Sequence, residues 1–447
     1  MRNQKILLIG EVFLDVYLDL KMTDHSEENL GPLNRLGGIF HSARACSAGK
    51  IDFSLAFCTA DYLIEDIKQW AEYLGAAECE QFATVTHAPN VMLVSHSQEA
   101  GDQGYKSILG SQAIVSSKGV LKSFVEKVRP TDILIFPGKY SIKEVFDAIG
   151  DSQIHIHIDC AYDSDDILNY LNREVETIIL STSSDLFRNQ CREMFDGMLA
   201  YFEGKQISSF LLKEGRGGAI AYSTEKEAKS FSPAYLTKIV HSVGVGDVYD
   251  IFCIREGFSK DLSDKMRIAS LCSAEYARTM SFDYFRECVD NILLSSSLCS
   301  QLQGTFLSWE ERKRHNIYLA GPDFPDVKTE LLDRLEEALC YQNFSPRRPI
   351  RENGLVGAEP EGLDSSDLHY LDYKLLENCS LLIATLLTPD PGTYAEIGIF
   401  FEMGKPVIIY DPYDICGNMF VRQCANMICA DLDSVINAVF ELLGERL

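Results

Sequence analysis

The sequence is short of positive charge. Lysine and arginine total 41 against 66 aspartate and glutamate residues, which gives the 447-residue chain a formal net charge of −25 at pH 7. A surface this acidic repels phosphate backbones and anionic lipid, which argues against nucleic-acid polymers and membranes as partners. Small nucleotides bind in local pockets whose field differs from the global one, so they stay open as ligands.

Long apolar runs and paired cysteines are also missing. No stretch approaches the roughly 18–20 apolar residues that a membrane span needs. The 14 cysteines are scattered without a C-x-x-C pair, which favours reduced thiols packed as small apolar side chains over disulfides or a zinc site. The opening MRNQKILLIGEVFLD enters a strand-like run directly, without the apolar core of a signal peptide. We therefore expect a cytoplasmic protein.

What remains is an ordinary globular composition, 46% hydrophobic and 24% charged. The length suggests two or three domains. Apolar, β-branched runs alternate with helix-like segments, so we expect an α/β protein with mostly parallel sheets and helices on both sheet faces. In the first part of the chain, strands are expected at 5–9, 132–136, 154–158, 177–180 and 210–213, and the extended segments 22–36 and 84–115 favour a small sheet over a site.

The character of the sequence changes after Cys299. The polar stretch SQLQGTFLSWEERKRHN favours a linker at 301–314, between a first domain at 1–300 and a second at 315–447. The second domain begins with the strand-like NIYLAGP and is a smaller α/β unit. Helices are expected there at 326–341, 368–377 and 431–443, and further strands at 381–387 and 406–410.

One local motif in the first domain carries chemistry. Gly244-Val245-Gly246-Asp247 precedes an apolar, helix-like run. Glycines just before a helix let backbone N–H groups approach an anion, and the helix N-terminus adds partial positive charge. A carboxylate at the same place accepts a proton from a hydroxyl. The motif therefore combines what phosphoryl transfer to an alcohol needs.

The surrounding sequence extends this motif into a resemblance. GEVFLD at 10–15, the pair Gly37-Gly38 and the run LLKEGRGGAIAY at 211–222 precede it in that order. Together they resemble the ribokinase-like (PfkB) sugar and nucleoside kinases over residues 3–300. The resemblance implies a three-layer α/β/α fold with a small β lid formed by the two extended segments.

The resemblance also implies roles for single residues. Asp247 would be the catalytic base, with ATP and Mg²⁺ as cofactors if the kinase is active. The other implied residues are an anion hole at Gly244, Val245 and Gly246, a sugar-binding side at Asp15, Gly37 and Gly38, and a nucleotide-binding stretch with Lys213, Gly215 and Gly218.

Several positions depart from the family pattern. Val245 replaces the usual alanine, and His241 stands where an acidic residue is usual. Ser42, with His41 beside it, replaces the asparagine after the double glycine. The magnesium and phosphate motif is replaced by STSSDLF, in which only Asp185 could serve as a metal ligand. An active kinase and a kinase fold that only binds its ligand therefore both stay open.

The second domain holds a denser set of functional side chains. Tyr318 precedes Gly321 at the end of the domain's first strand, where ligands bind in open α/β sheets. Asp372 lies in a helix-like run, and DPGTYAEIG at 390–398 then leads into a helix. Glu396 would lie just inside the start of that helix, facing the strand ends where Tyr318 and Asp372 also converge.

Cleavage of an N-glycosidic bond needs such a set. A carboxylate attacks or stabilises the anomeric carbon as positive charge builds, and an acid protonates the departing base. The alternative is that Asp390 and Glu396 only complement the dipole of the helix that they begin. The ordered set of acids favours the glycosidic site.

The order Y-L-A-G-P, D, D-x-G-T-x-x-E-x-G and G-K-P-V is similar to the nucleoside 2-deoxyribosyltransferase family over 315–447. The resemblance implies Glu396 as the nucleophile that forms a deoxyribosyl ester, Asp372 and Asp390 as acids that handle base and sugar, and no cofactor. It implies a homo-oligomer, because the Asn418 loop reaches a neighbouring subunit in that family. The implied substrate contacts are Tyr318, Gly321, Phe324, Gly392, Thr393 and Asn418.

Three arginines in the second domain leave two interpretations open. Arg347, Arg348 and Arg351 follow F-S-P on an expected site-facing loop. They could hold the phosphate of a nucleoside 5′-monophosphate, which a related branch of the family hydrolyses, or form a solvated basic turn.

These observations predict an enzyme of nucleoside or nucleotide metabolism whose partners are small molecules: a nucleoside, a nucleotide or a pentose. The second domain would cleave or transfer the N-glycosidic bond of a (deoxy)nucleoside or its monophosphate. The first would bind a sugar or nucleoside and, if active, phosphorylate it with ATP. The alternative is a degenerate kinase domain that acts as a nucleotide sensor or scaffold and gates a nucleotide-depleting glycosidase.

Overall fold

The chain divides into two compact units. The first comprises Met1–Gln98, Gln103–Phe306 and Arg446–Leu447, and the second comprises Glu99–Asp102 and Leu307–Glu445. The main division thus falls inside the stretch 301–314 that the sequence sets apart as a linker. The structure, a computed structural model, describes all residues except 1–3, 19–32, 88, 97, 102–105, 108–112, 118, 151–152, 161–166, 257–260, 300, 325 and 355–364.

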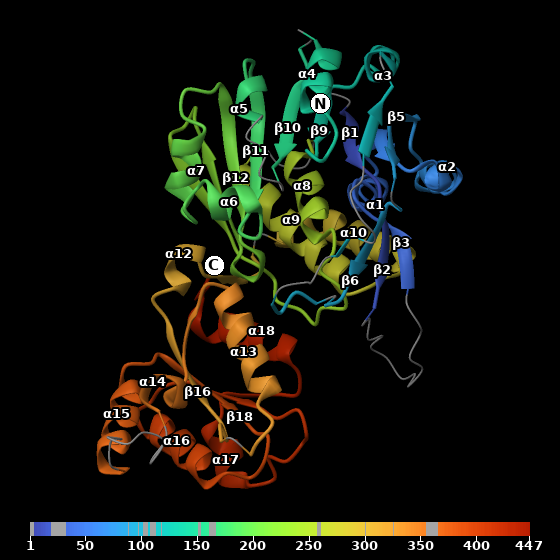
Figure 1. Cartoon of the computed structure of the whole chain (residues 1–447). Helices are drawn as coiled ribbons and strands as arrows, with labels where there is room; N and C mark the ends of the chain where they lie inside the picture. Colours follow the sequence, from blue (N-terminus) through green and yellow to red (C-terminus); the bar gives the residue numbers. More distant parts are fainter. Residues whose placement is uncertain are drawn as a thin grey trace. The chain divides into compact units, whose positions relative to one another are not determined.

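A large sheet organises the first unit (Figure 1). Its described strands run in the order β14-β13-β12-β11-β10-β9-β1-β4-β5-β8. The pairs from β12 to β5 are parallel, and β13, β14 and β8 are antiparallel at the two edges. All five strands expected from the sequence are present. The bounds are β1 (Lys5–Glu11), β4 (Asp52–Thr59), β5 (Cys79–Thr86), β8 (Ala113–Ser116), β9 (Asp132–Ile135), β10 (His155–Asp159), β11 (Val175–Ser181), β12 (Ile207–Lys213), β13 (Ala219–Ser223) and β14 (Ala228–Ser232).

Two groups of helices cover this sheet, as expected for parallel strands joined by crossovers. One group packs together and includes the helix that follows the glycine motif; its members are α1 (Phe40–Ala48), α2 (Ile64–Leu74), α8 (Val245–Ile254), α9 (Leu262–Ala277) and α10 (Phe282–Leu294). The other group comprises α3 (Val120–Val128), α4 (Ile142–Ile149) and α5 (Ile167–Tyr170), and the short helices α6 (Asp185–Asn189) and α7 (Phe195–Tyr201) follow β11.

A separate small sheet is also present in the first unit. Its order is β3-β2-β6-β7, with bounds β2 (Leu14–Tyr17), β3 (Leu33–Leu36), β6 (Val91–Val94) and β7 (Lys106–Ser107). The expected small sheet from 22–36 and 84–115 is therefore correct for β3, β6 and β7, and residues 22–32 lie outside the described residues. It is wrong for the two ends of 84–115, because β5 and β8 pair in the large sheet. The extended character of a segment does not determine which neighbouring strand it pairs with.

The second unit is built on a smaller, all-parallel sheet. Its order is β17-β16-β18-β19-β20. The chain runs from β16 to one side and then returns to the other side of it, so a switch point lies between β16 and β18. Ligands bind outside the carboxyl ends of strands at such a point. The strands are β16 (Asn316–Ala320), β17 (Ser345–Arg347), β18 (Leu381–Thr385), β19 (Val407–Tyr410) and β20 (Met427–Cys429).

The helices of the second unit connect these strands. They are α12 (Trp309–Arg312), α13 (Glu330–Tyr341), α14 (Pro349–Asn353), α15 (Ser365–Glu377), α16 (Pro391–Glu402), α17 (Met419–Cys424) and α18 (Leu432–Leu443). The predicted α/β class, with a large first unit and a smaller parallel-sheet unit after it, is thereby confirmed. Among the described residues, none of the helices is long and apolar enough to cross a membrane.

Candidate functional site

In the second unit, a hydrogen bond joins the first strand to the helix after β18. Tyr318 on β16 is fully buried, and its hydroxyl donates to Oε1 of Glu396 at 2.6 Å. Glu396 lies on α16, the connection that leaves the carboxyl end of β18. The pair therefore stands at the switch point between β16 and β18, as the sequence predicted for Tyr318 and Glu396.

The start of α16 is fixed by its N-cap. Oδ2 of Asp390 accepts hydrogen bonds from the backbone N–H and the hydroxyl of Thr393, both at 2.7 Å. Pro391 occupies the first turn, where its missing N–H costs nothing. A Cβ on Gly392 would lie 3.2 Å from Oδ2 of Asp390. Asp390 thus serves as the helix-start acid, and the cap also sets the position of Glu396 farther along the helix.

The environment of Glu396 raises its pKa. Burial contributes most, the carboxylates of Asp372 and Asp390 add to it, and the hydrogen bond from Tyr318 opposes it, which brings the pKa to about 7. The pKa of Tyr318 is raised as well, by burial first, then by Glu396 and by the charge of Asp372. The structure therefore brings together all four polar residues that the sequence assigned to glycosidic chemistry.

Two further residues of this site were not singled out from the sequence. Nδ2 of Asn353, the last residue of α14, donates to Oδ1 of Asp372 at 2.8 Å and so orients that carboxylate. Thr385 ends β18 fully buried, and its hydroxyl has no hydrogen-bond partner within the described part of the chain. A threonine at the carboxyl end of a central parallel strand was the available signal for Thr385.

The remaining predicted residues of this unit lie around the site in different ways. Gly321 follows β16, and a Cβ there would lie 3.3 Å from the carbonyl oxygen of Thr385. Phe324 is 44% exposed. Asn418 is exposed and caps α17, because its Oδ1 accepts from the backbone N–H groups of Phe420 and Val421. No described hydrogen bond joins Asn418 to Glu396.

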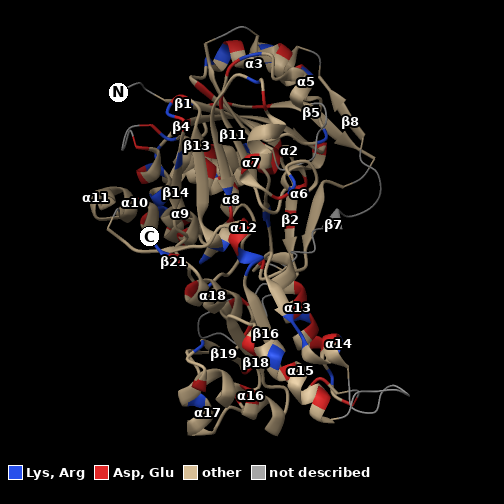
Figure 2. Ribbon diagram, turned by 90° about the vertical axis from the view of Figure 1, so that its left-hand side faces the viewer, with Lys and Arg blue, Asp and Glu red and all other residues tan. Residues whose placement is uncertain are grey.

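The three arginines all form ion pairs, and they differ in exposure: Arg348 is buried, whereas the side chain of Arg351 is 53% exposed. Arg348 is buried and pairs with Asp323, Asp333 and Glu336. Arg351 reaches the same two acids of α13, Asp333 and Glu336, at 2.7 Å each, and Arg347 pairs with Glu352. The acidic residues of α13 are visible in Figure 2. The carboxylates of Asp333 and Glu336 thus already pair with two of the three guanidinium groups that the sequence suggested for binding a phosphate.

In the first unit, the glycine motif begins α8 as predicted. Gly244 is the N-cap and has a φ of 75°, a conformation that favours glycine. A Cβ at Gly244 would lie 2.0 Å from Cγ of His41, so the imidazole packs directly against the backbone there. Asp247 lies in the first turn, and burial raises its pKa to about 7 against the opposing effect of Lys213.

Lys213 ends β12 and lies among acids. Its Nζ donates to Oδ2 of Asp159 at 2.9 Å and to both carboxylate oxygens of Asp250 at 2.8 and 2.9 Å. A contact to the carbonyl oxygen of Gly246 follows at 3.3 Å. Asp159, Asp247 and Asp250 each place one carboxylate oxygen within 4.8 Å of the others, a spacing at which they could share a metal ion.

The predicted sugar-binding side holds a buried polar chain. Asp15 accepts at Oδ2 from Nε2 of His41 at 3.1 Å, and Nδ1 of His41 lies 2.8 Å from the hydroxyl of Tyr276. Burial keeps the pKa of His41 well below its usual value and raises the pKa of Asp15 to about 7. A Cβ on Gly37 would lie 2.0 Å from Asp15, and one on Gly38 would lie 2.1 Å from the carbonyl oxygen of Glu11.

Other predicted residues of the first unit lie at turns. Gly215 has a φ of 58° and Gly218 a φ of 98°, in the turn between β12 and β13. Asp185 is exposed in the first turn of α6 and is not part of the carboxylate group around Lys213. Val245 and Gly246 form the first turn of α8, where their N–H groups belong to the helix N-terminus.

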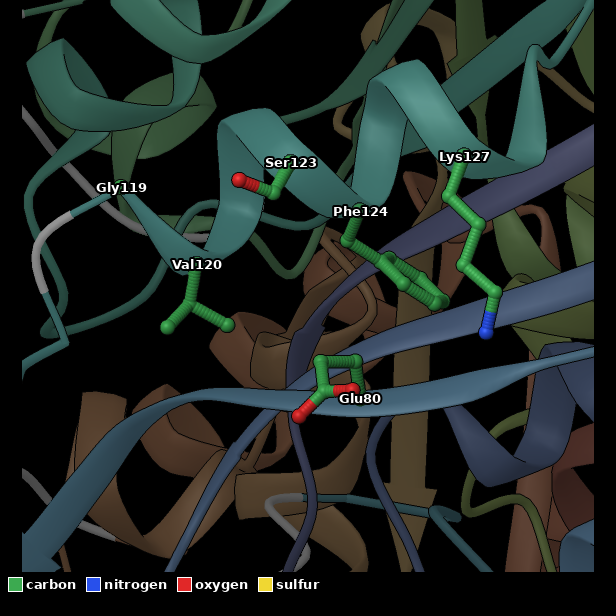
Figure 3. Close-up of a pocket in the computed structure, with 6 residues that line it drawn as sticks. All are labelled: Glu80, Gly119, Val120, Ser123, Phe124 and Lys127. Carbon is green, nitrogen blue, oxygen red and sulfur yellow. The ribbon is translucent and has the colours of Figure 1, made fainter.

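A pocket of about 480 Å³ lies elsewhere on the first unit, between β5 and α3 (Figure 3). Glu80, Gly119, Val120, Ser123, Phe124 and Lys127 line it. None of these residues belongs to either cluster described above.

Comparisons with known proteins agree with this division. Residues 317–437 match the family model of nucleoside 2-deoxyribosyltransferases. No curated protein matches the chain.

Solved structures are similar to the first unit. Phosphofructokinase-2 from Escherichia coli in complex with potassium is 11% identical with a TM-score of 0.50, over 66% of this chain and 100% of that chain. A mutant of the same enzyme is 12% identical with a TM-score of 0.50, over 65% of this chain and 99% of that one. Ribokinase from Giardia lamblia is 16% identical with a TM-score of 0.47, over 65% and 99% of the two chains.

The chain is thus a fusion. Its first unit has the fold of the ribokinase-like (PfkB) kinases, and its second unit carries the nucleoside 2-deoxyribosyltransferase match. Both resemblances seen in the sequence are confirmed at that level. At identities of 11–12%, the likeness of the first unit concerns the fold alone.

Proposed function

We propose that the second unit cleaves or transfers the N-glycosidic bond of a (deoxy)nucleoside or nucleoside monophosphate, with Glu396 as the nucleophile. The observation that carries the proposal is the 2.6 Å hydrogen bond from Tyr318 to Oε1 of Glu396 at the switch point of the sheet. A carboxylate that served only the helix dipole would need no buried partner on another element. The family match of residues 317–437 supports a nucleoside as the substrate.

The proposed reaction proceeds in two displacements. Tyr318 holds Oε1 of Glu396, so Oε2 attacks the anomeric carbon of the sugar. The carbon–oxygen bond forms as the bond to the base nitrogen breaks, and the departing base takes the electron pair together with a proton. Water or a second base then attacks the same carbon, loses a proton and releases the carboxylate. Two inversions retain the configuration of the sugar.

Asp372 is the residue proposed to protonate the departing base. Asn353 holds its Oδ1, and the charge of Asp372 acts on the pKa of both Glu396 and Tyr318. Asp390 keeps α16 in register through its cap and adds negative charge near the anomeric carbon. Positive charge that builds on the sugar in the transition state is stabilised by these carboxylates.

The first unit is proposed to bind a sugar or nucleoside. Asp15 and Asp247 are the carboxylates offered to ligand hydroxyls, and burial raises the pKa of each to about 7. The fold of this unit is similar to that of phosphofructokinase-2 from Escherichia coli.

Glu396→Gln should abolish base release and base exchange in a nucleoside and nucleotide panel read by chromatography. Removal of a nucleophile typically costs on the order of 10⁴-fold or more in rate. The fold should persist, and above pH 7 the variant should melt at an equal or higher temperature, because glutamine avoids the burial of a charge. Glu402→Gln, an exposed acid at the end of the same helix, is the matched control and should keep full activity. Near-normal base release by Glu396→Gln would end the nucleophile assignment.

The rate of cleavage should fall as the pH drops below about 7, because a protonated Glu396 cannot attack. Tyr318→Phe removes the hydrogen bond that lowers the pKa of Glu396, so the midpoint of the pH–rate profile should move to higher pH. Tyr370→Phe, an exposed tyrosine on α15, should leave the midpoint in place. A midpoint that Tyr318→Phe does not move would contradict the coupling.

We also propose a homo-oligomer that forms through the second unit. Large apolar side chains are exposed on α17 and on α16, which contacts it; they are Met419, Phe420 and Phe401. Light scattering should give a mass that is a multiple of the chain's mass, and Met419→Ser with Phe420→Ser should reduce it. Phe231→Ser, an exposed phenylalanine on β14, is the control. A fully active monomer at assay concentration would rule the proposal out.

A further inference from the structure

The carboxylate cluster of the first unit contains its own cation. Lys213 ends β12, Asp159 ends β10 and Asp250 lies on α8, and the three side chains are almost completely buried. Parallel strands β10 and β12 present their carboxyl ends at the same edge of the sheet, with β11 between them. The cluster therefore lies where α/β folds bind their ligands.

The hydrogen bonds of Lys213 are fully used within the protein. An ammonium group has three hydrogens. Its acceptors are Asp159, Asp250 and, at 3.3 Å, the carbonyl oxygen of Gly246. Burial lowers the pKa of Lys213, but the carboxylates of Asp159, Asp250 and Asp247 together raise it by more, so the side chain keeps its charge. Lys213 has no hydrogen left for a nucleotide phosphate.

Mg²⁺ does not fit this arrangement, although the donor atoms are of the right kind. Carboxylate oxygens are the ligands that Mg²⁺ prefers, and Asp159, Asp247 and Asp250 could share one ion. Lys213 already contacts oxygens of two of the three at 2.8–2.9 Å. A divalent ion on the same oxygens would stand beside an ammonium group, and charges of one sign repel strongly where water is excluded.

The environment of Asp250 also indicates that Lys213 belongs to the protein's own charge pairing. Asp250 is fully buried, and it interrupts the apolar run of α8. A buried carboxylate needs a paired charge. Lys213 supplies that charge with hydrogen bonds to both oxygens of Asp250. Burial still raises the pKa of Asp250 and Lys213 opposes that rise, so the hydrogen bonds to both oxygens give Lys213 a structural role and not a role in holding a mobile substrate.

We propose that Lys213 is a built-in cation that takes the place of a divalent metal ion, so that the first unit binds a neutral sugar or nucleoside without Mg²⁺ and does not transfer phosphate. Asp247 and Asp15 then bind ligand hydroxyls and the unit acts as a binding module. This inference is independent of Glu396 and of the chemistry of the second unit.

The test is binding of Mn²⁺ to the full-length chain, measured from the electron paramagnetic resonance signal of the free ion. Wild-type protein and the Asp159→Asn variant should bind the same amount of Mn²⁺, because the cluster holds no ion. Lys213→Met exposes three carboxylates to one another and should gain one bound Mn²⁺ per chain, which an added Asp159→Asn should abolish. Lys229→Met is the control, because Lys229 forms an exposed pair with Asp196 and its loss should create no such site.

Each outcome decides the proposal. If Lys213→Met folds only when Mn²⁺ is present, the gained site is demonstrated directly. If it does not fold at all, Lys213→Met with Asp250→Asn removes one charge of each sign and should bind Mn²⁺ more weakly through Asp159 and Asp247. A bound Mn²⁺ in wild type that depends on Asp159 would overturn the proposal, as would a folded variant that gains none. Mg²⁺-dependent ATP consumption by wild type with a pentose or nucleoside, lost in Asp247→Asn, would overturn it as well.

Discussion

The hydrogen bond between Tyr318 and Glu396 constrains the second unit at its switch point. It ties the strand that begins the sheet to the helix that leaves β18, across 78 positions of sequence. The bond also determines which oxygen of Glu396 is available, because Oε1 is occupied. Burial around the pair raises the pKa of the carboxyl group, and Tyr318 limits that rise. This contact therefore acts on both the orientation and the protonation of the proposed nucleophile.

Both units place acids at the carboxyl ends of parallel strands, but they handle the resulting negative charge differently. In the second unit a neutral tyrosine is the partner of Glu396. The nearby acids Asp372 and Asp390 keep the site negatively charged, and negative charge stabilises a cation that develops on a sugar. In the first unit Lys213 neutralises its neighbours. The arrangement in the second unit suits bond cleavage at an anomeric carbon. The arrangement in the first unit suits retention of an uncharged ligand.

Much of the fold could be predicted because burial on both sheet faces leaves continuous apolar runs. The strands at 5–9, 154–158 and 381–387 were visible for that reason, and each has a counterpart in β1, β10 and β18. The two ends of 84–115 were harder, since an extended segment can pair in either sheet, and β5 and β8 pair with each other in the large one. Local sequence contains the period of a strand but not the identity of its neighbour.

The candidate sites were predictable where a motif is local. Asp390, Thr393 and Glu396 lie within two turns of each other, so their spacing already placed them at a helix start. Asp159 and Asp250 were missed because their partner Lys213 stands 54 and 37 positions away.

Long-range pairing also decided the basic residues. The ion pairs of Arg348 with Asp323 and Asp333 span 25 and 15 positions, and composition alone could not assign them. A charged residue inside an apolar helix, such as Asp250, is the signal that would have pointed to a buried pair.

The central claim is that Glu396 bonds covalently to the sugar, and trapping the intermediate tests it most directly. A nucleoside with fluorine at the 2-position of its sugar slows the positively charged transition state of both displacements, so an ester should accumulate on the intact chain. Digestion and mass spectrometry should find the fluoro-sugar on the peptide that contains Glu396, and the adduct should be absent from Glu396→Gln. An adduct on any other residue, or base release with no adduct and an unaffected Glu396→Gln variant, would contradict the account.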